Sequence, residues 1–287
     1  MKSICFFSSY YESERIPYYI QYYLEELSRH FSEVIFLTNE KKLPEDDIQF
    51  LGEKKIQFRT CKNEGFDFGM WSKAFLEFPV STYERIGLVN DSCILFKKLD
   101  FFFDTLNKSD ADYFGMTDSK AISFHLQSYF VVMNKKAIQI VYDYFLEHKI
   151  VPDILQVIRV YEVGLCSRLL ENKLKLSACF STLDYDGEFS PAFYLADQLI
   201  ARGIPLVKKK ILFSSFRKDE YLTLMRMNFN IDPGYYIDQI RKMNKGEPLI
   251  DFDKVMTDNL NPGNSFHIWK FRVMSFFFQL LRKVKPS

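Results

Sequence analysis

The first hundred residues alternate short apolar runs with helix-like stretches, and this alternation restricts the fold more than any other feature. The apolar runs cover residues 4–8, 33–38, 56–60 and 85–89, and helical spacing covers residues 17–31 and 66–78. Strands that alternate with helices form a mostly parallel sheet with helices on both faces. The sequence therefore predicts an α/β fold.

Polar loops follow three of the predicted strands. They are Ser8-Ser9-Tyr10, Asn63-Glu64-Gly65 and Asn90-Asp91-Ser92. In open α/β sheets, ligands bind beyond the carboxyl ends of the strands. We therefore expect these loops to meet at one edge of the sheet and to form the binding site there.

The second half is less regular. Apolar patterning predicts strands over residues 112–117, 128–133 and 176–180, and helices over residues 135–148, 161–171 and 191–202. The last helix should stop at Gly203, with Pro205 just beyond it. From about residue 216 the pattern is again helical. We therefore predict one α/β domain over residues 1–215 and a helical C-terminal extension over residues 216–287.

Composition limits the classes of function. A net charge of +1 and a pI of about 7.6 do not suit a nucleic-acid-binding protein. The five cysteines are scattered without CxxC spacing, which indicates reduced thiols in a cytoplasmic protein. The sequence shows no signal peptide and no apolar stretch that would span a bilayer. The aromatic share of 17% fits either core packing or stacking on bases and sugar rings.

Two acidic residues near strand ends are candidates for donor binding. Asp91 ends an apolar strand, where a carboxylate can hold Mg²⁺ or Mn²⁺ for a diphosphate or can simply close a turn. Asp67 begins a helix, where it can accept hydrogen bonds from a sugar or ribose or can cap the helix. Trp71 either shapes the donor side or packs in the core. Asn90 and Ser92 flank Asp91, and Ser8 and Tyr10 are expected near the nucleotide.

Other residues suit the acceptor side. Glu162 precedes an apolar helical stretch, and a carboxylate at a helix start can serve as the general base of a sugar transfer or can interact with the helix dipole. A polar group before a predicted strand either lines an acceptor pocket or forms an ordinary loop; its members are His125, Gln127, Ser128 and Tyr129. The tail over residues 269–285 interleaves aromatics and leucines with basic residues, which favours a helix at a membrane surface over a docked helix or a dimer contact.

These segments together resemble the rhamnan synthesis protein F family. The resemblance rests on residues 63–71, 90–92, 112–117 and 127–130 and covers about residues 1–215. It implies a glycosyltransferase that uses a nucleoside-diphosphate sugar, such as a dTDP- or UDP-sugar, and transfers L-rhamnose or another hexose to a lipid-linked surface polysaccharide. The implied location is the cytoplasmic face of the membrane.

More distantly, the layout resembles the large inverting glycosyltransferase family with the GT-A fold. That resemblance implies a metal at Asp91 and a general base at Glu162. Two departures matter: the usual Asp-x-Asp is Asn90-Asp91-Ser92 here, and the usual acidic pair is reduced to Glu162. The missing acids leave open a second reading, in which the chain is a non-catalytic module that binds nucleotide sugars or glycans. The enzyme reading requires Asp67, Asp91 and Glu162 to lie around one cleft.

Overall fold

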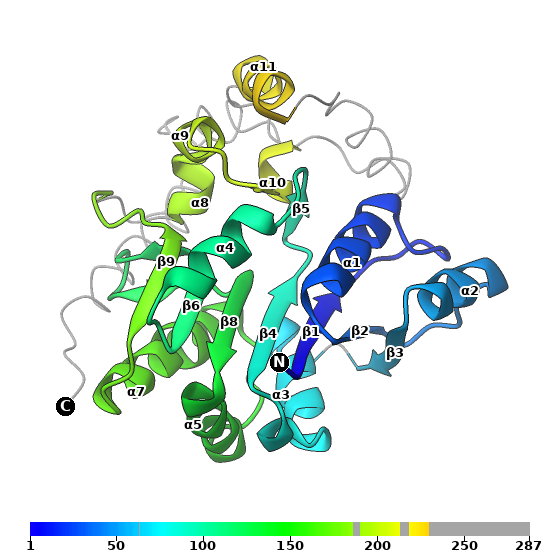
Figure 1. The fold of residues 1–287 in the computed structure, drawn as a ribbon, viewed down its shortest axis with the longest axis horizontal. Helices are drawn as coiled ribbons and strands as arrows, with labels where there is room; N and C mark the ends of the chain where they lie inside the picture. The colour runs from blue at the N-terminus through cyan, green and yellow to red at the C-terminus, as the bar shows by residue number, and fades with distance from the viewer. Residues whose placement is uncertain (63, 186–189, 213–217, 230–287) are drawn as a thin grey trace, which may run out of the picture.

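A mixed sheet with helices on both faces forms the centre of the protein (Figure 1). The computed structural model describes residues 1–62, 64–185, 190–212 and 218–229. The main sheet has the strand order β3-β2-β1-β4-β8-β6-β7, and β9 pairs with β6. A separate two-stranded sheet joins β10 to β5. This architecture confirms the predicted α/β class, a mostly parallel sheet flanked by helices.

The first half contains the parallel part of the sheet. Its elements are β1 (Ser3–Ser9), α1 (Tyr18–His30), β2 (Glu33–Asn39), α2 (Glu45–Glu53), β3 (Ile56–Cys61), α3 (Phe66–Glu77), the 3-10 turn η1 (Val80–Thr82), β4 (Arg85–Asn90), β5 (Cys93–Leu95) and α4 (Asp100–Lys108). Every residue of β1 is buried, because helices cover both faces of the sheet there. That burial explains why the middle of the strand, residues 4–7, is a continuous apolar run.

The second half completes the sheet and adds the upper helices of Figure 1. Its elements are β6 (Tyr113–Ser119), β7 (His125–Leu126), β8 (Phe130–Asn134), α5 (Lys135–Glu147), α6 (Ile154–Val157), the π-helical segment η2 (Ile158–Gly164), α7 (Leu165–Glu171), β9 (Leu176–Phe180), α8 (Pro191–Tyr194), α9 (Ala196–Ala201), β10 (Leu206–Lys208), α10 (Lys209–Leu212) and α11 (Lys218–Phe229). The predicted domain boundary at residues 215–216 lies outside the described residues.

Two apolar cores cover the two faces of the sheet. One contains the buried sides of α1, α4 and α9, and the other contains those of α3, α5 and α7. Since β8 runs antiparallel to β4, the residues that precede β8 lie beside the carboxyl end of β4. Ser8 pairs in register with Asn90 across β1 and β4. The strand-end loops of β1 and β4 therefore meet at one edge, as predicted.

Candidate functional site

Asp67 joins the ends of the two central strands. The Ser8 hydroxyl donates to Asp67 Oδ1 at 2.9 Å, and the Asn90 side-chain amide donates to Oδ2 at 2.7 Å. These two partners come from β1 and β4, whereas Asp67 lies in the first turn of α3. Three segments far apart in sequence thus share one carboxylate at the predicted edge.

A tight turn places Asp67 there. Gly65 has φ +75°, a left-handed conformation that glycine adopts without strain, and Phe66 follows with φ +55°. Gly65 occupies the N-cap position of α3 without a side-chain cap. The alternative that Asp67 caps the helix is therefore wrong. Trp71 is fully buried in the core, so the proposed contact between Trp71 and the donor is not available in this structure.

Asp91 is buried directly after the end of β4 and has hydrogen-bond and ion-pair partners of its own. The Lys209 ammonium lies 2.7 Å from Asp91 Oδ2, and the Tyr19 hydroxyl donates to the same oxygen at 3.2 Å. The backbone N–H of Asp91 donates to the Ser8 carbonyl at 3.2 Å. Asp91 is therefore an ion-paired carboxylate held against the end of β1.

A second lysine lies beside the first. The Lys208 ammonium donates to the Ser92 hydroxyl at 3.1 Å and lies 4.6 Å from the centre of the Tyr129 ring. Within the part of the chain that the structure describes, no ion pair involves Lys208. The antiparallel pairing of β10 with β5 sets Lys208 opposite Cys93, which brings both lysines back to the end of β4.

Burial and charge perturb Asp67 strongly. Desolvation, followed by the nearby negative charge of Asp91, raises the pKa of Asp67 from 3.8 to about 6. The hydrogen bond from Ser8 and the charges of Lys208 and Lys209 act in the opposite direction. A carboxyl group with such a pKa at a sheet edge is a reasonable candidate for a functional group.

This shift predicts a pH-dependent stability for Asp67→Asn. Between about pH 4 and 6 the unfolded chain loses the Asp67 proton while the folded chain keeps it, so the wild type loses stability as pH rises through that window. Above about pH 6 Asp67 is ionised in both the folded and the unfolded chain, so the wild type retains the full loss of stability. We expect the variant to be more stable than wild type at pH 7.5, by on the order of 2–3 kcal/mol, and the gain to shrink at pH 4.5.

Urea unfolding of the whole chain at both pH values measures this gain. Asparagine still has one acceptor for Asn90 and one donor for the Ser8 hydroxyl, so the hydrogen bonds can persist. Asp104→Asn, at an exposed position of α4, is the control. A gain of equal size at pH 4.5 and 7.5 would contradict the assignment.

Glu162 contacts the backbone of the turn over residues 127–129. The backbone N–H of Ser128 donates to Glu162 Oε1 at 2.6 Å, and the Tyr129 carbonyl accepts from the Asn90 backbone N–H at 3.1 Å. This turn therefore links Glu162 to the end of β4. No hydrogen bond to Glu162 Oε2 is found among the residues placed in the structure.

The helix around Glu162 differs from the prediction. The sequence pattern predicts a helix start next to Glu162, but helical structure begins at Ile154, where Asp153 caps it by accepting from the Gln156 N–H. Glu162 lies inside the π-helical segment η2. Such segments are rare and often mark functional positions. Glu162 therefore does not lie at a helix start, and the alternative that it interacts with the helix dipole there is wrong.

The predicted acceptor residues are mostly internal. The side chains of His125, Gln127 and Tyr129 are buried, and Gln127 bridges the Thr117 and Ser190 hydroxyls. Tyr129 pairs with the Thr117 hydroxyl at 2.8 Å. Only Ser128 of the four is partly exposed. The Gln127 and Tyr129 side chains hold the turn over residues 127–129 to Thr117 and Ser190. Direct contact of the three buried side chains with an acceptor finds no support.

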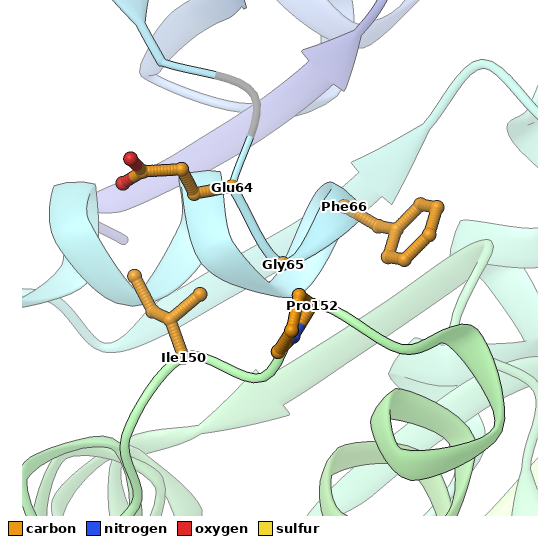
Figure 2. Close-up of a pocket in the computed structure, with 5 residues that line it drawn as sticks. All are labelled: Glu64, Gly65, Phe66, Ile150 and Pro152. Atoms are coloured by element: carbon orange, nitrogen blue, oxygen red, sulfur yellow. The ribbon is translucent and has the colours of Figure 1, made fainter.

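A pocket of about 440 Å³ opens next to the start of α3. Figure 2 shows Glu64 and Phe66 pointing to different sides of Gly65, with Ile150 and Pro152 facing them from the loop before α6. The Phe66 ring is 42% exposed. Asp67 follows Phe66 in the first turn of α3, but its carboxylate is not part of the pocket lining. Tyr10, predicted near the nucleotide, is 51% exposed beyond β1.

The residues present do not fit a divalent cation at Asp91. Mg²⁺ needs near-octahedral oxygen ligands, and Mn²⁺ likewise takes carboxylate oxygens. Lys209 and Tyr19 already contact Asp91 Oδ2, and both oxygens of Asp67 accept hydrogen bonds. A cation bound here would lie next to the Lys209 ammonium. We therefore assign no metal to Asp91.

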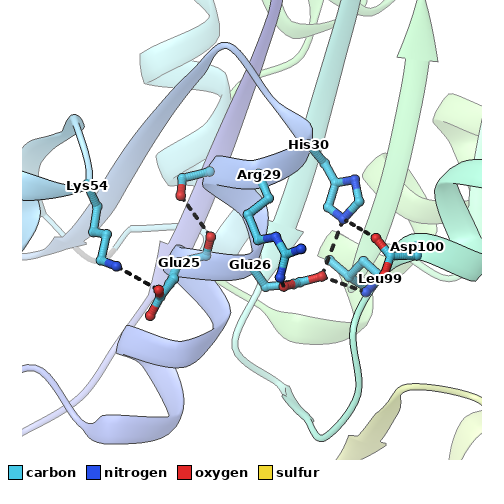
Figure 3. Close-up of polar contacts among 8 residues, drawn as sticks. Glu25, Glu26, Arg29, His30, Lys54, Leu99 and Asp100 are labelled. Atoms are coloured by element: carbon cyan, nitrogen blue, oxygen red, sulfur yellow. Dashed lines mark hydrogen bonds and ion pairs between the residues drawn. The ribbon is translucent and has the colours of Figure 1, made fainter.

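A second group of possible metal ligands lies between α1 and α4, the two helices that share one apolar core. Glu26, His30 and Asp100 come within metal-binding distance of one another (Figure 3). The Leu99 backbone N–H donates to Glu26 Oε1 at 2.9 Å. Arg29 and His30 also contact the Glu26 carboxylate. This group therefore ties the end of α1 to the start of α4, and within the described residues no hydrogen bond or ion pair joins it to Asp67.

Sequence reasoning missed Lys208, Lys209 and Tyr19. The signal for the lysines is a run of three, Lys208 to Lys210, directly after a short apolar run that follows the helix stop at Gly203. Nothing in the sequence places this run opposite β5, because a short antiparallel pair between distant segments has no local pattern. Tyr19 has the helical spacing of a core residue and gives no separate signal.

Comparison with known proteins places the chain next to a polysaccharide-synthesis family. The family described as Rhamnan synthesis protein F matches residues 34–261. No curated protein matches the chain. No helix in the described ranges has both the length and the apolar character needed to cross a membrane.

Several solved structures are similar to the chain at low identity. A cytidylyltransferase from Leptospira borgpetersenii is 13% identical, with a TM-score of 0.41, over 85% of this chain and 94% of that one. The glycosyltransferase GlyE of Streptococcus pneumoniae is 13% identical, with a TM-score of 0.40, over 84% of this chain and 64% of that one. The galactosyltransferase LgtC, solved with donor and acceptor sugar analogues, is 13% identical, with a TM-score of 0.31, over 61% and 72%.

Proposed function

The chain belongs to the rhamnan synthesis protein F family, and we propose that it is a glycosyltransferase that moves a sugar from a nucleoside diphosphate to a hydroxyl group of a surface polysaccharide. The observation that carries this proposal is the meeting of Asp67 and Asp91 with Ser8 and Asn90 at the carboxyl ends of β1 and β4. That edge is where open α/β sheets bind their ligands.

The proposed reaction inverts the configuration at the sugar carbon C1. Glu162 accepts the proton of the acceptor hydroxyl, the acceptor oxygen forms a bond to C1, and the bond between C1 and the diphosphate oxygen breaks. The nucleoside diphosphate leaves with the bonding electron pair. Glu162 suits the role of base because Oε1 is fixed by the Ser128 N–H, which leaves Oε2 for the acceptor.

We assign the acceptor to the pocket beside Gly65. Its exposed aromatic ring, Phe66, offers an apolar face for a sugar ring, and Glu64 offers a carboxylate for sugar hydroxyls. We propose a deoxyhexose such as L-rhamnose as the transferred sugar, from a dTDP- or UDP-donor. The lipid-linked acceptor and the membrane-binding tail stay predictions, and the tail lies outside the described residues.

The acceptor assignment makes a prediction for Phe66→Ala. Removing the ring should raise the KM for the acceptor about tenfold, because roughly 1–1.5 kcal/mol of ring contact is lost, while donor affinity stays at the wild-type value. Steady-state kinetics with varied acceptor measure the effect. Phe101→Ala, which removes a ring from α4 at a more exposed residue (61% against 42% for Phe66), is the control. A change in donor affinity instead of acceptor KM would refute the assignment.

The function itself is tested by a turnover assay on the full chain. A panel of dTDP-, UDP-, GDP- and CDP-sugars is incubated with the protein and a glycan acceptor, and the released nucleoside diphosphate is measured. We expect one donor to be consumed in an acceptor-dependent way. Donor binding without any consumption would identify the alternative, a binding module. No binding of any donor would refute the glycosyltransferase and leave only a module that binds glycans.

A further inference from the structure

The donor site already contains the positive charge that a diphosphate needs. Lys208 and Lys209 supply two ammonium groups, and Asp67 and Asp91 supply two carboxyl groups that interact electrostatically with them. The formal charges of these four side chains cancel when both acids are ionised. A divalent cation would therefore add to a site that is already neutral, next to an ammonium that would repel it.

The two lysines are placed for different tasks. Lys209 is committed to the buried Asp91 carboxylate at 2.7 Å, and its backbone N–H donates to the Ser92 carbonyl at 2.9 Å. Lys208 contacts only a neutral hydroxyl and an aromatic face among the described residues. Its charge is thus available to an incoming anion, while that of Lys209 is largely used to neutralise Asp91.

We propose that Lys208 binds the diphosphate of the donor and that Lys209 occupies the place of a divalent cation on Asp91, so that donor binding requires no metal. The inference rests on the proposed function and adds to it how the negative charge of the donor is balanced. Lys208 is the residue that contacts the donor. Lys209 is a positioning residue that prevents Asp91 from repelling it.

The local structure supports this division. Lys208 ends β10, whose antiparallel pairing with β5 fixes the backbone next to the Asn90-Asp91-Ser92 turn. Lys209 begins α10 and packs beside the Tyr19 ring, with its ammonium 5.4 Å from the ring centre. Both side chains are only partly exposed, whereas the neighbouring Lys210 is exposed. The run of three lysines therefore contains a natural control.

Calorimetric titration with dTDP, UDP, GDP and CDP tests the proposal in the full chain. In EDTA, the nucleotide that the wild type binds should bind as tightly as with Mn²⁺. Lys208→Met should weaken its binding about 10- to 100-fold, the loss typical of a hydrogen bond to a charged group. Lys210→Met should leave the affinity unchanged. Thermal unfolding shows whether each variant is folded.

Lys209→Met gives the sharper readout. It exposes Asp91 as an unpaired carboxylate, so binding in EDTA should be lost and Mn²⁺ should restore it. The double variant Lys209→Met with Asp91→Asn removes the charge as well as its partner; it should fold even if the single variant does not, and it should bind without responding to Mn²⁺.

Each outcome decides a different question. Wild-type binding that disappears in EDTA would overturn the metal-free proposal and leave the proposed function standing. No binding of any nucleotide, with or without Mn²⁺, would remove the proposed function itself. Equal affinities of wild type and Lys208→Met would refute the role of Lys208.

Discussion

Replacing Glu162 by glutamine lowers the turnover number by a factor of about 10² to 10⁴, the usual contribution of a general base, and leaves donor affinity within twofold of wild type. The structure indicates that this substitution removes the base without removing its local hydrogen bond. The glutamine carbonyl oxygen can still accept the hydrogen bond from the Ser128 N–H that Glu162 Oε1 accepts at 2.6 Å. The turn over residues 127–129 therefore keeps its anchor, and only the ability to take a proton is lost.

Two further variants separate chemistry from position. Glu162→Ala removes both the base and the acceptor for the Ser128 N–H, so it should also disturb the turn that holds Asn90 through the Tyr129 carbonyl and should weaken donor binding. Glu171→Gln, at an exposed position of the following helix α7, is the control for a lost negative charge. Single-turnover assays with titrated donor give both quantities. Wild-type turnover by Glu162→Gln would remove Glu162 from the mechanism.

The parts of the fold that sequence predicted well are those with a local signal. The strands β1, β2 and β4 appear as buried apolar runs because both faces of the sheet are covered. The same pattern says nothing about α2, whose acidic first turn lacks an apolar stripe, or about β5, which has three residues. Short elements are defined by the neighbours they pair with, and those neighbours are distant in sequence.

In the candidate site, too, some features have a sequence signal and others do not. The strand ends could be predicted to meet because a parallel sheet brings its carboxyl ends to one edge, which places Ser8 and Asn90 together. The ion pair between Asp91 and Lys209 could not be predicted, since 118 residues separate the two. Trp71 shows the limit of residue type as evidence: the same glycine-rich segment that positions Asp67 also buries this ring.

The glycine-rich segment that positions Asp67 also contains the position of the site that least tolerates a larger side chain. Gly69 lies in α3 directly against the loop that precedes it, and a Cβ atom there would come within 1.6 Å of the Glu64 carbonyl oxygen and 2.7 Å of its carbon. Both obstacles are backbone atoms, so no side-chain rotation can relieve the contact. The Glu64 peptide would have to move, and with it the Gly65 turn that sets the direction of Asp67.

Gly69→Ala should therefore destabilise the protein by on the order of 3 kcal/mol, at the upper end of what overpacking usually costs, and should abolish donor binding in whatever fraction still folds. Urea unfolding measures the first effect and calorimetric titration with the donor nucleotide the second. Gly52→Ala is the matched control, because Gly52 lies on the exposed side of α2 and an added Cβ meets nothing within 4 Å.

At the control position alanine should be neutral or stabilising by up to about 1 kcal/mol, since it has the higher helix propensity. The contrast between the two glycines isolates the close approach of α3 to its own entry loop from the general effect of alanine in a helix. If Gly69→Ala were as stable as wild type and still bound donor, the turn from Glu64 to Asp67 would not be what positions the carboxylate. The meeting of Ser8, Asp67 and Asn90 would then need another cause.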